Sequence, residues 1–184
     1  NHYNPLRDYL DALAWDGTPR LEHWLTTYLG AEDSQYTRAV GQWWMTSAVA
    51  RAYQPGVQAD HVLILEGAQG VGKSSAIRIL AGPWYLGSRP DLRDRDACDR
   101  LGGAWIVEIG ELDALRGASA TRIKDFISQT IDAYRPAYGR YTVRRPRACV
   151  FAGTTNDASY LRDATGARRF WPIYCKEVNL DRLR

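Results

Sequence analysis

The sequence predicts an α/β fold in which helices cover a mostly parallel sheet. From about residue 57 onward, short apolar runs of strand length alternate with stretches of helical periodicity, which is typical of parallel sheets. The residues before 57 show helical patterning only. The chain has 184 residues, of which 45% are hydrophobic and 24% charged, an ordinary globular composition. We therefore expect an N-terminal helical segment over residues 1–56 and an α/β core over residues 57–184.

Helix-start signals occur near the N-terminus. Asn4 followed by Pro5 is such a signal. The Asn side chain caps backbone N–H groups that have no partner in the helix, and Pro at the first helical position forfeits no helical hydrogen bond. Thr18-Pro19 repeats the signal for a second helix that is expected to end near Gly30. A third, longer helix fits residues 34–53. Its apolar stripe is predicted to face the core and comprises Tyr36, Val40, Trp43, Trp44 and Ala48.

The rest of the chain alternates between predicted strands and helices. Apolar runs predict strands at residues 62–65, 105–109, 148–152 and 170–174, and helices are predicted at 74–80 and 119–129. Gly82-Pro83 is expected to end the first of these helices. A hairpin is predicted at about residues 131–147, within a segment rich in arginine and tyrosine.

Residues 67–74 match the pattern G-x-x-x-x-G-K-[S/T] in full, between a predicted strand and a predicted helix. This pattern arises by chance in fewer than about 1% of chains of this length. Its backbone N–H groups and the helix N-terminus bind phosphate, Lys73 reaches the β- and γ-phosphates, and the Ser74 hydroxyl ligates Mg2+. The sequence therefore predicts a nucleoside triphosphatase with ATP and Mg2+ as cofactors. The expected nucleotide-binding residues are Gly67, Ala68, Gln69, Gly70, Val71, Gly72, Lys73, Ser74 and Ser75.

Acidic residues follow the strand predicted at residues 105–109. A phosphate loop needs one acid at the end of a second strand for the Mg2+ shell, and usually another to polarise the attacking water. Glu108 is expected to hold the metal together with Ser74, and Glu111 to orient the water, with Asp113 as a weaker choice. The alternative is that these are solvated loop carboxylates, which are common in α/β proteins.

Polar residues follow the two later strands. Asn156, just after the strand at residues 148–152, is a candidate sensor that would bind the γ-phosphate or the attacking water. The alternative for a lone Asn in a turn is a capping role. Arg168 and Arg169 follow a glycine and precede the last strand, so either could reach a neighbouring subunit's nucleotide as an arginine finger. The alternative is an internal ion pair.

The segment from residue 135 to residue 147 contains five arginines and no acid. Arginines neutralise phosphates and tyrosines stack on unpaired bases, which favours contact with single-stranded DNA over a merely solvated basic loop. The candidate contact residues are Arg135, Tyr138, Arg140, Tyr141, Arg144, Arg145 and Arg147.

Taken together, these motifs resemble the virulence-associated E family, helicase-like proteins of phages, plasmids and mobile genomic islands. The matching pieces are Trp15-Asp16-Gly17, residues 66–74, residues 105–112, Tyr134-Arg135-Pro136, Thr154-Thr155-Asn156 and residues 166–172. The family looks related to superfamily 3 helicases and poxvirus-type primase-helicases, which are AAA+-like ATPases working as hexameric rings. The resemblance therefore implies an AAA+-like P-loop NTPase fold and a homo-oligomer.

The resemblance also implies residue roles. It makes Asn156 the sensor on the strand beside the phosphate loop, and Arg168 or Arg169 a finger acting across a subunit interface. Residues 124–147 would correspond to the region of the DNA-contacting hairpin. This adds Lys124, which would also lie near the nucleotide, to the expected DNA-contacting residues. Many superfamily 3 proteins have two adjacent acids after the second strand. Here Ile109 follows Glu108, so the second acid is Glu111 or is absent.

These observations predict an ATP-dependent DNA helicase or translocase motor domain for replication of a phage or mobile element. Two alternatives use the same loop: a small-molecule kinase and a non-motor nucleotide switch. Relatives often carry a primase domain in the same full-length chain, and this chain, which begins at Asn1 and lacks such a segment, is expected to be a piece of a longer protein.

The sequence also bears on the cellular compartment. No apolar run reaches the roughly 18 residues needed to cross a bilayer, so no membrane partner is expected and the cytoplasm is the expected location. The three cysteines are scattered, which favours buried or incidental thiols over a zinc site.

Overall fold

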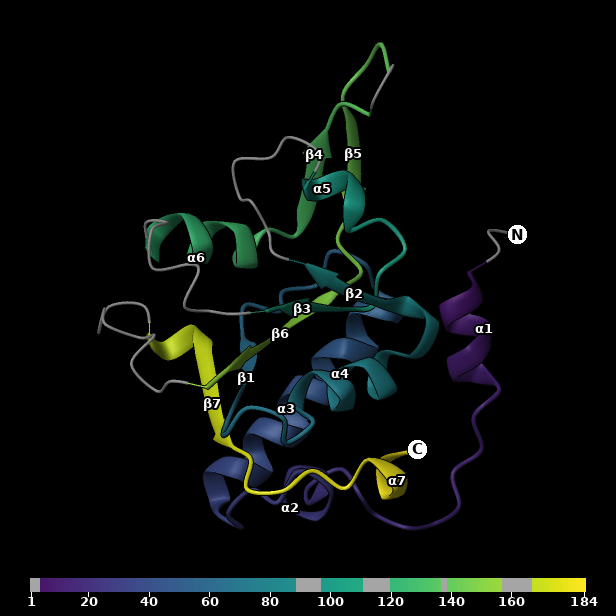
Figure 1. The fold of residues 1–184 in the computed structure, drawn as a ribbon. Coiled ribbons are helices and arrows are strands. Elements are labelled where there is room, and N and C mark those ends of the chain that lie inside the picture. Colours follow the sequence, from purple (N-terminus) through teal and green to yellow (C-terminus); the bar gives the residue numbers. More distant parts are fainter. Residues whose placement is uncertain (1–3, 89–96, 111–119, 137–138, 157–166) are drawn as a thin grey trace.

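The computed structural model describes residues 4–88, 97–110, 120–136, 139–156 and 167–184. Its centre is a five-stranded parallel sheet with the strand order β2-β3-β6-β1-β7 (Figure 1). These strands are β1 (Val62–Glu66), β2 (Tyr85–Ser88), β3 (Ile106–Ile109), β6 (Val150–Thr155) and β7 (Phe170–Tyr174). A separate antiparallel pair is formed by β4 (Ile131–Tyr134) and β5 (Val143–Pro146).

Helices cover both faces of the sheet, as the sequence predicts. They are α1 (Pro5–Asp11), α2 (Trp24–Leu29), α3 (Gln35–Tyr53), α4 (Lys73–Ala81), α5 (Ala97–Arg100), α6 (Ala120–Ser128) and α7 (Leu180–Leu183), with short 3-10 helices η1 (Gly82–Trp84) and η4 (Ala167–Arg169). Successive side chains of β1 point to opposite faces. Leu63 and Leu65 pack with the N-terminal helices and α4, whereas Val62 and Ile64 pack with Ile127 of α6. In Figure 1, α3 and α4 lie below the sheet and α6 lies above it.

The start of α1 confirms the capping signal predicted at Asn4-Pro5, and α3 begins with a cap that was not predicted. The Asn4 side chain accepts a hydrogen bond from the Arg7 backbone N–H at 3.2 Å, and Pro5 is the first residue of α1. Helix α3 begins after Ser34, whose hydroxyl accepts from the Thr37 N–H at 3.1 Å. Both helices therefore begin where a polar side chain satisfies an otherwise free backbone donor.

The predicted start of the second helix is wrong, because α2 begins at Trp24 rather than at Thr18-Pro19. The Asp16 carboxylate accepts the Thr18 N–H at 3.0 Å and pairs with Arg20 at 2.7 Å. Here Asp16 stabilises a local turn in place of a helix start. The end of the helix is as predicted, with Gly30 in the left-handed conformation at a φ of 60°.

The apolar stripe of α3 faces the core only in part. Val40, Trp44 and Ala48 are buried, and the Trp44 indole donates to the Phe151 carbonyl at 2.9 Å. Tyr36 and Trp43 are 48% and 58% exposed, which corrects the prediction for these two residues. Trp43 and Trp44 are consecutive, so their side chains leave the helix axis in directions about 100° apart, and only Trp44 faces the core.

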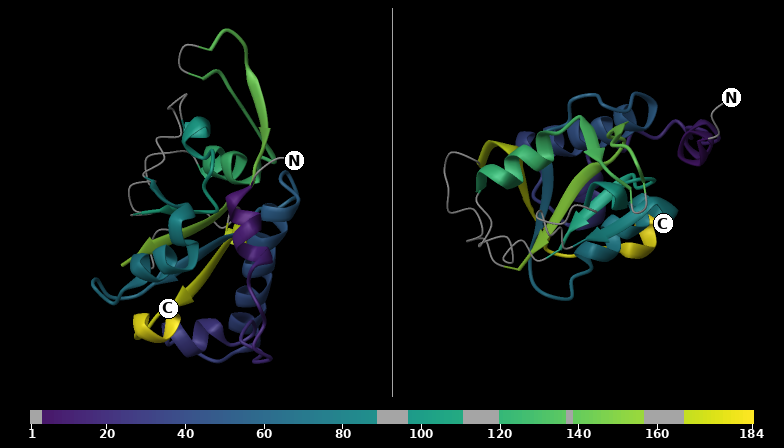
Figure 2. Two further views of the ribbon diagram at one scale, coloured as in Figure 1. Left: turned by 90° about the vertical axis from the view of Figure 1, so that its right-hand side faces the viewer. Right: turned by 90° about the horizontal axis from the view of Figure 1, so that it is seen from above.

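The later strands follow the predicted order with two differences. Strand β6 covers Val150–Thr155, so it begins two residues later and ends three residues later than the predicted strand at residues 148–152. Strand β2 was not predicted, because Tyr85–Ser88 contains a glycine and a serine in place of a continuous apolar run. The hairpin expected at residues 131–147 is confirmed by the pairing of β4 with β5 and extends away from the central sheet (Figures 1 and 2).

Among the described residues, no helix combines the length and the apolar character that crossing a membrane requires.

Candidate nucleotide-binding site

The candidate site lies at the carboxyl edge of the sheet. All five strands are parallel, so the loop after β1, the end of β3 and the end of β6 meet at this edge. Strand β6 lies between β1 and β3. The predicted phosphate loop therefore lies directly beside the strand that leads to Asn156, with Glu108 on the strand beyond.

The loop after β1 has the backbone that its glycines permit. Gly67, Gly70 and Gly72 have φ values of 144°, 84° and 99°, a region that residues with side chains rarely adopt. A Cβ atom on Gly67 would lie 2.5 Å from the Cys175 carbonyl oxygen, so this position also lacks room for a side chain. The loop borders a pocket of about 350 Å3. The pocket is lined by Gln69, Gly70, Gly72, Lys73, Ser74, Ser75, Thr154, Thr155 and Asn156.

The Lys73 side chain joins the loop to β6. Its ammonium group donates to the Gly67 and Ala68 carbonyl oxygens, each at 2.8 Å, and to Asn156 Oδ1 at 3.0 Å. Burial lowers the pKa of Lys73, and burial also raises the pKa of the nearby Cys175 thiol to about 12. The structure therefore brings together the candidate phosphate-binding lysine and the candidate sensor, which lie 83 positions apart in the sequence.

The Glu108 carboxylate is buried, with 3% of the residue exposed, and it accepts three hydroxyl hydrogen bonds. Its Oε1 accepts from Ser74 Oγ at 2.6 Å and from Thr154 Oγ1 at 2.9 Å, and its Oε2 accepts from Tyr85 Oη. Sequence reasoning anticipated the pairing of Ser74 with Glu108 but missed Tyr85 and Thr154. Thr154 lies within the Thr154-Thr155-Asn156 motif, whereas Tyr85 lies in no motif that would indicate a place in the site.

The Ser74 and Glu108 oxygens suit a magnesium ion, because hydroxyl and carboxylate oxygens are hard ligands that Mg2+ prefers. Helix α4 presents Ser74 from its first turn, and β3 presents Glu108 from the same edge of the sheet. A protein site with so few ligands is typical of Mg2+, which keeps waters and takes further oxygens from nucleotide phosphates.

The candidate water-orienting acid Glu111, the weaker choice Asp113 and the hairpin residue Tyr138 lie outside the described residues. Lys124 is partly exposed on α6 and has interactions of its own.

Arg168 and Arg169 lie far from the loop of their own subunit. They precede β7, whose first residue, Phe170, pairs with Val62 at the start of β1. The predicted phosphate loop begins at Gly67, at the other end of β1. Five residues of strand separate the two ends, a distance of about 16 Å. Neither arginine therefore belongs to the nucleotide site of its own chain.

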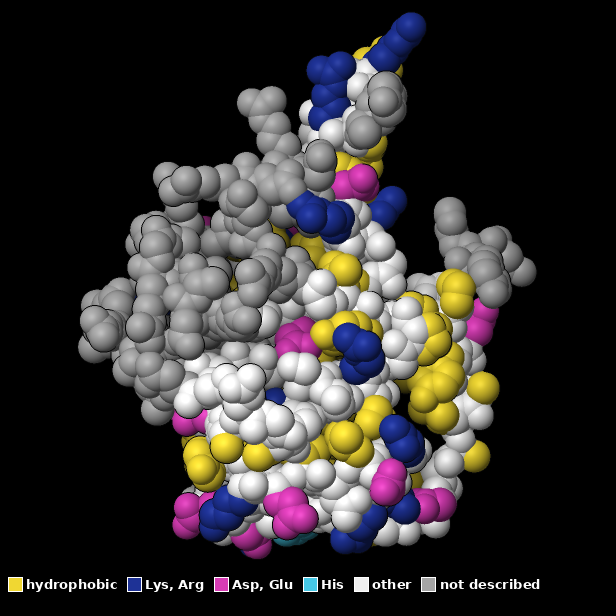
Figure 3. All heavy atoms as spheres, viewed as in Figure 1, with side chains coloured by type: hydrophobic (Ala, Val, Ile, Leu, Met, Phe, Trp, Pro, Cys, Tyr) yellow, Lys and Arg dark blue, Asp and Glu magenta, His cyan; other side chains and the backbone are white. Residues whose placement is uncertain are grey.

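Basic side chains line the β4–β5 hairpin, where Figure 3 shows several of them projecting from the body. Arg135, Arg140, Arg144 and Arg145 are exposed, and Tyr141 is 82% exposed. Arg135 donates to the Gly139 carbonyl at 2.7 Å, across the connection between the strands. This surface therefore combines exposed positive charge with an exposed aromatic ring.

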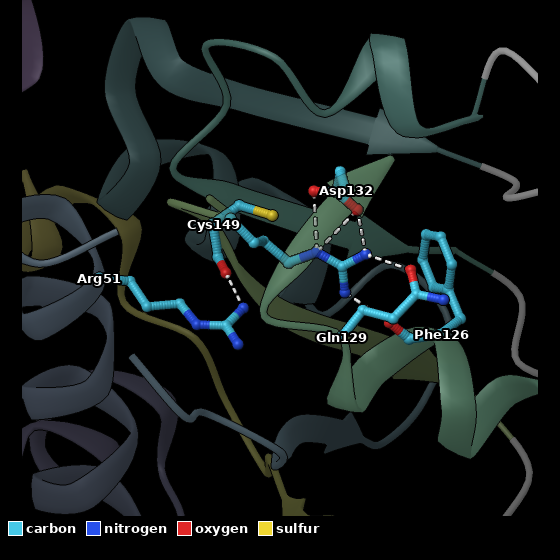
Figure 4. A network of polar contacts seen from close by, with 6 residues as sticks. Arg51, Phe126, Gln129, Asp132 and Cys149 are labelled. Atoms are coloured by element: carbon cyan, nitrogen blue, oxygen red, sulfur yellow. Dashed lines mark hydrogen bonds and ion pairs between the residues drawn. The ribbon is translucent and has the colours of Figure 1, made fainter. Parts of the chain in front are cut away.

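Arg147 is different and corrects the predicted set of DNA contacts (Figure 4). Its side chain is 0% exposed and forms an ion pair with Asp132 of β4, with Nε 3.1 Å from Oδ2. The guanidinium also donates to Gln129 Oε1 at 3.2 Å and lies 4.8 Å from the Phe126 ring centre. Arg147 thus anchors the base of the hairpin to α6 and is not available to DNA.

Replacing Arg147 by alanine should lower the free energy of unfolding by about 3–5 kcal/mol, because Asp132 would remain buried without its partner. Urea unfolding followed by circular dichroism measures this difference. Arg144→Ala is the matched control, since that arginine is exposed on β5, the strand that ends just before Arg147. Its effect on the free energy of unfolding should stay within about 0.5 kcal/mol. Equal stability of the two variants would contradict an anchoring role.

The sequence matches the family model described as the virulence-associated protein E-like domain over residues 10–184. A comparison with curated proteins finds no match. Two solved apo structures of the NrS-1 C-terminal region are similar in fold. The one in the A form has a TM-score of 0.63 at 19% identity, and the other has 0.58 at 17%. The similarity covers 95% of this chain but only 41% and 42% of those chains, so this chain spans less than half of their length.

Proposed function

Because the chain belongs to the virulence-associated protein E-like family, we propose that it is an Mg2+-dependent ATPase with an AAA+-like P-loop fold. We further propose that it acts as a motor domain on single-stranded DNA in the replication of a phage or mobile element. The observation that carries the proposal is the joining of three strands at one pocket. Lys73 of the loop is hydrogen-bonded to Asn156, and Ser74 of the same loop is hydrogen-bonded to Glu108.

The proposed chemistry follows from these contacts. Lys73 would exchange the Gly67 and Ala68 carbonyls for β- and γ-phosphate oxygens, which is favourable for a buried ammonium group. Asn156 would hydrogen-bond the γ-phosphate, and Ser74 and Glu108 would hold Mg2+. The metal, when bound, neutralises charge on the phosphates. Glu111 is proposed to orient the attacking water.

A neighbouring subunit is proposed to complete the site. Arg168 and Arg169 lie at the opposite end of the sheet from their own phosphate loop, as a residue acting in trans requires. A head-to-tail contact between copies of the chain would bring these arginines to the next subunit's nucleotide and would close into a ring. We propose a hexameric ring for the full-length protein, which could include a primase domain.

The proposed DNA contact makes hydrolysis depend on the hairpin. ATP turnover should rise with single-stranded DNA and with protein concentration, because both favour an assembled ring.

Tyr141→Ala should weaken DNA binding by about 1–3 kcal/mol, because it removes the ring on which a base would stack. Arg144→Ala should reduce the slope of the logarithm of affinity against the logarithm of salt concentration by about 0.7. Fluorescence anisotropy with labelled oligonucleotide measures both effects.

Arg182→Ala is the control for this experiment, because that arginine is exposed on α7, far from the hairpin in Figure 1. Its affinity and salt slope should equal those of the unchanged protein. Turnover that responds neither to DNA nor to concentration would refute the motor. Nucleotide binding without hydrolysis would then indicate a switch, and phosphoryl transfer to a small acceptor would indicate a kinase.

A further inference from the structure

Tyr85 reaches the candidate metal carboxylate from a strand that sequence motifs do not mark. Strands β2 and β3 are parallel, with Tyr85 opposite Ile106 and Gly87 opposite Glu108. Residues opposite one another share a face of the sheet, so Tyr85 and Glu108 both face α4. The Tyr85 ring extends along β2 in the direction of Glu108, and its hydroxyl donates to Glu108 Oε2.

Gly87 provides the space for this reach. A Cβ atom at Gly87 would lie 2.8 Å from Tyr85 Oη and 3.2 Å from two of its ring carbons, closer than side-chain contacts normally come. The Gly87 backbone has no left-handed φ, so its conformation does not require glycine. The absence of a side chain at Gly87 therefore leaves room for the tyrosine ring beside it.

Arg78 of α4 lies over the ring, with its guanidinium 4.9 Å from the ring centre. Arg78 and Ser74 are four positions apart and so lie on one side of α4. The same helix therefore carries the Ser74 hydroxyl and confines the tyrosine.

The two oxygens of Glu108 have different partners. Oε1 accepts from Ser74 and Thr154, whereas Tyr85 is the partner of Oε2. The terminal torsion of a glutamate is soft, so partners at one oxygen alone leave the carboxylate plane free to turn. The hydrogen bond from the Tyr85 phenol to Oε2 restricts this rotation of the carboxylate. The Ser74 hydroxyl can donate its hydrogen to Oε1 and still present the lone pairs of its own oxygen to a cation.

We propose that Tyr85 is a positioning residue that holds the Glu108 carboxylate in the orientation that binds Mg2+ beside Ser74, with Gly87 making room for it. This inference rests on the proposed function, since it assumes that nucleotide and metal bind at this loop. Residues that orient a metal ligand through a hydrogen bond typically contribute a factor of about 10–100 in metal affinity.

Mn2+ binding measured by electron paramagnetic resonance, with a non-hydrolysable ATP analogue present, tests the proposal without relying on turnover. Tyr85→Phe removes only the hydroxyl and should weaken Mn2+ binding about 10–100-fold. Gly87→Ala should weaken it similarly by displacing the ring. Binding of the analogue in EDTA should be unchanged in both variants. Tyr9→Phe, at an exposed tyrosine of α1, should match the unchanged protein in both measurements.

The outcomes separate this inference from the proposed function. Unchanged Mn2+ affinity in Tyr85→Phe would overturn the positioning role while leaving the ATPase proposal intact. Equal losses of metal-free and metal-dependent nucleotide binding would also overturn it, because Tyr85 would then support the fold of the loop. If the unchanged protein binds neither the analogue nor Mn2+ with it, the proposed function itself fails, and the inference fails with it.

Discussion

Lys73→Ala should abolish ATP hydrolysis, with a turnover number at least about 100-fold lower than that of the unchanged protein. The expected loss is large because Lys73 is the positively charged side chain among the residues that line the pocket, and its ammonium group would meet the transferred phosphate directly. Its present partners are two loop carbonyls and Asn156, so it is already aimed into the pocket. Release of inorganic phosphate at saturating Mg2+ measures the effect.

Lys176→Ala is the matched control for this substitution, since that lysine is exposed just after β7. It should leave turnover unchanged. Removal of the lysine also takes away the hydrogen bonds to the Gly67 and Ala68 carbonyls, which would then bind water in the pocket. Thermal unfolding of both variants therefore checks that the Lys73 variant still folds. Normal hydrolysis by a folded Lys73→Ala protein would refute the assignment of the site.

The parts of the site that are local in sequence could be predicted. The glycine positions, Lys73 and Ser74 lie within eight consecutive residues, and their chemistry depends on a strand before them and a helix after them. Glu108 and Asn156 follow from the same logic, because each lies at the carboxyl end of a buried strand. Parallel strands bring these ends together whatever the intervening sequence.

The parts that depend on packing across the sheet could not be predicted. Nothing in the Arg144-Arg145-Pro146-Arg147 run distinguishes its last arginine, yet Arg147 is buried against Asp132 while Arg144 and Arg145 are exposed. The difference arises because β5 ends at Pro146 and the chain then turns into the core. The proposed role of Tyr85 was equally invisible in the sequence, because it depends on the register that sets Gly87 opposite Glu108.

Register also decides the placement of the double arginine. Adjacency to the last strand was visible in the sequence, but the pairing of that strand with β1 and its register were not. Because β7 is parallel to β1 and begins level with it, Arg168 and Arg169 lie at the end remote from the pocket. The strand pairing therefore places both arginines away from the candidate pocket of their own chain, so the role that we propose for them in hydrolysis requires a second copy.

A mixture of two inactive variants should consequently recover ATP hydrolysis. Arg168→Ala or Arg169→Ala should lower turnover by about 10³–10⁵-fold, the range for loss of an arginine finger. Lys73→Ala is inactive for a different reason, since its own pocket is defective while its arginines are intact. In a mixed assembly, a Lys73→Ala subunit would supply its arginines to the intact pocket of an arginine-variant neighbour. Turnover should therefore rise on mixing, at concentrations where the chain assembles.

The two arginines can be separated by the same experiment. Arg168 is exposed, whereas Arg169 is partly buried near His61, whose pKa is lowered by burial and to a lesser degree by Arg169. We expect Arg168→Ala to show the larger loss and the larger recovery on mixing. An arginine variant that keeps normal turnover is not the finger. An inactive arginine variant that assembles with Lys73→Ala but shows no recovery would contradict action in trans, because each mixed ring contains junctions with an intact pocket and an intact arginine.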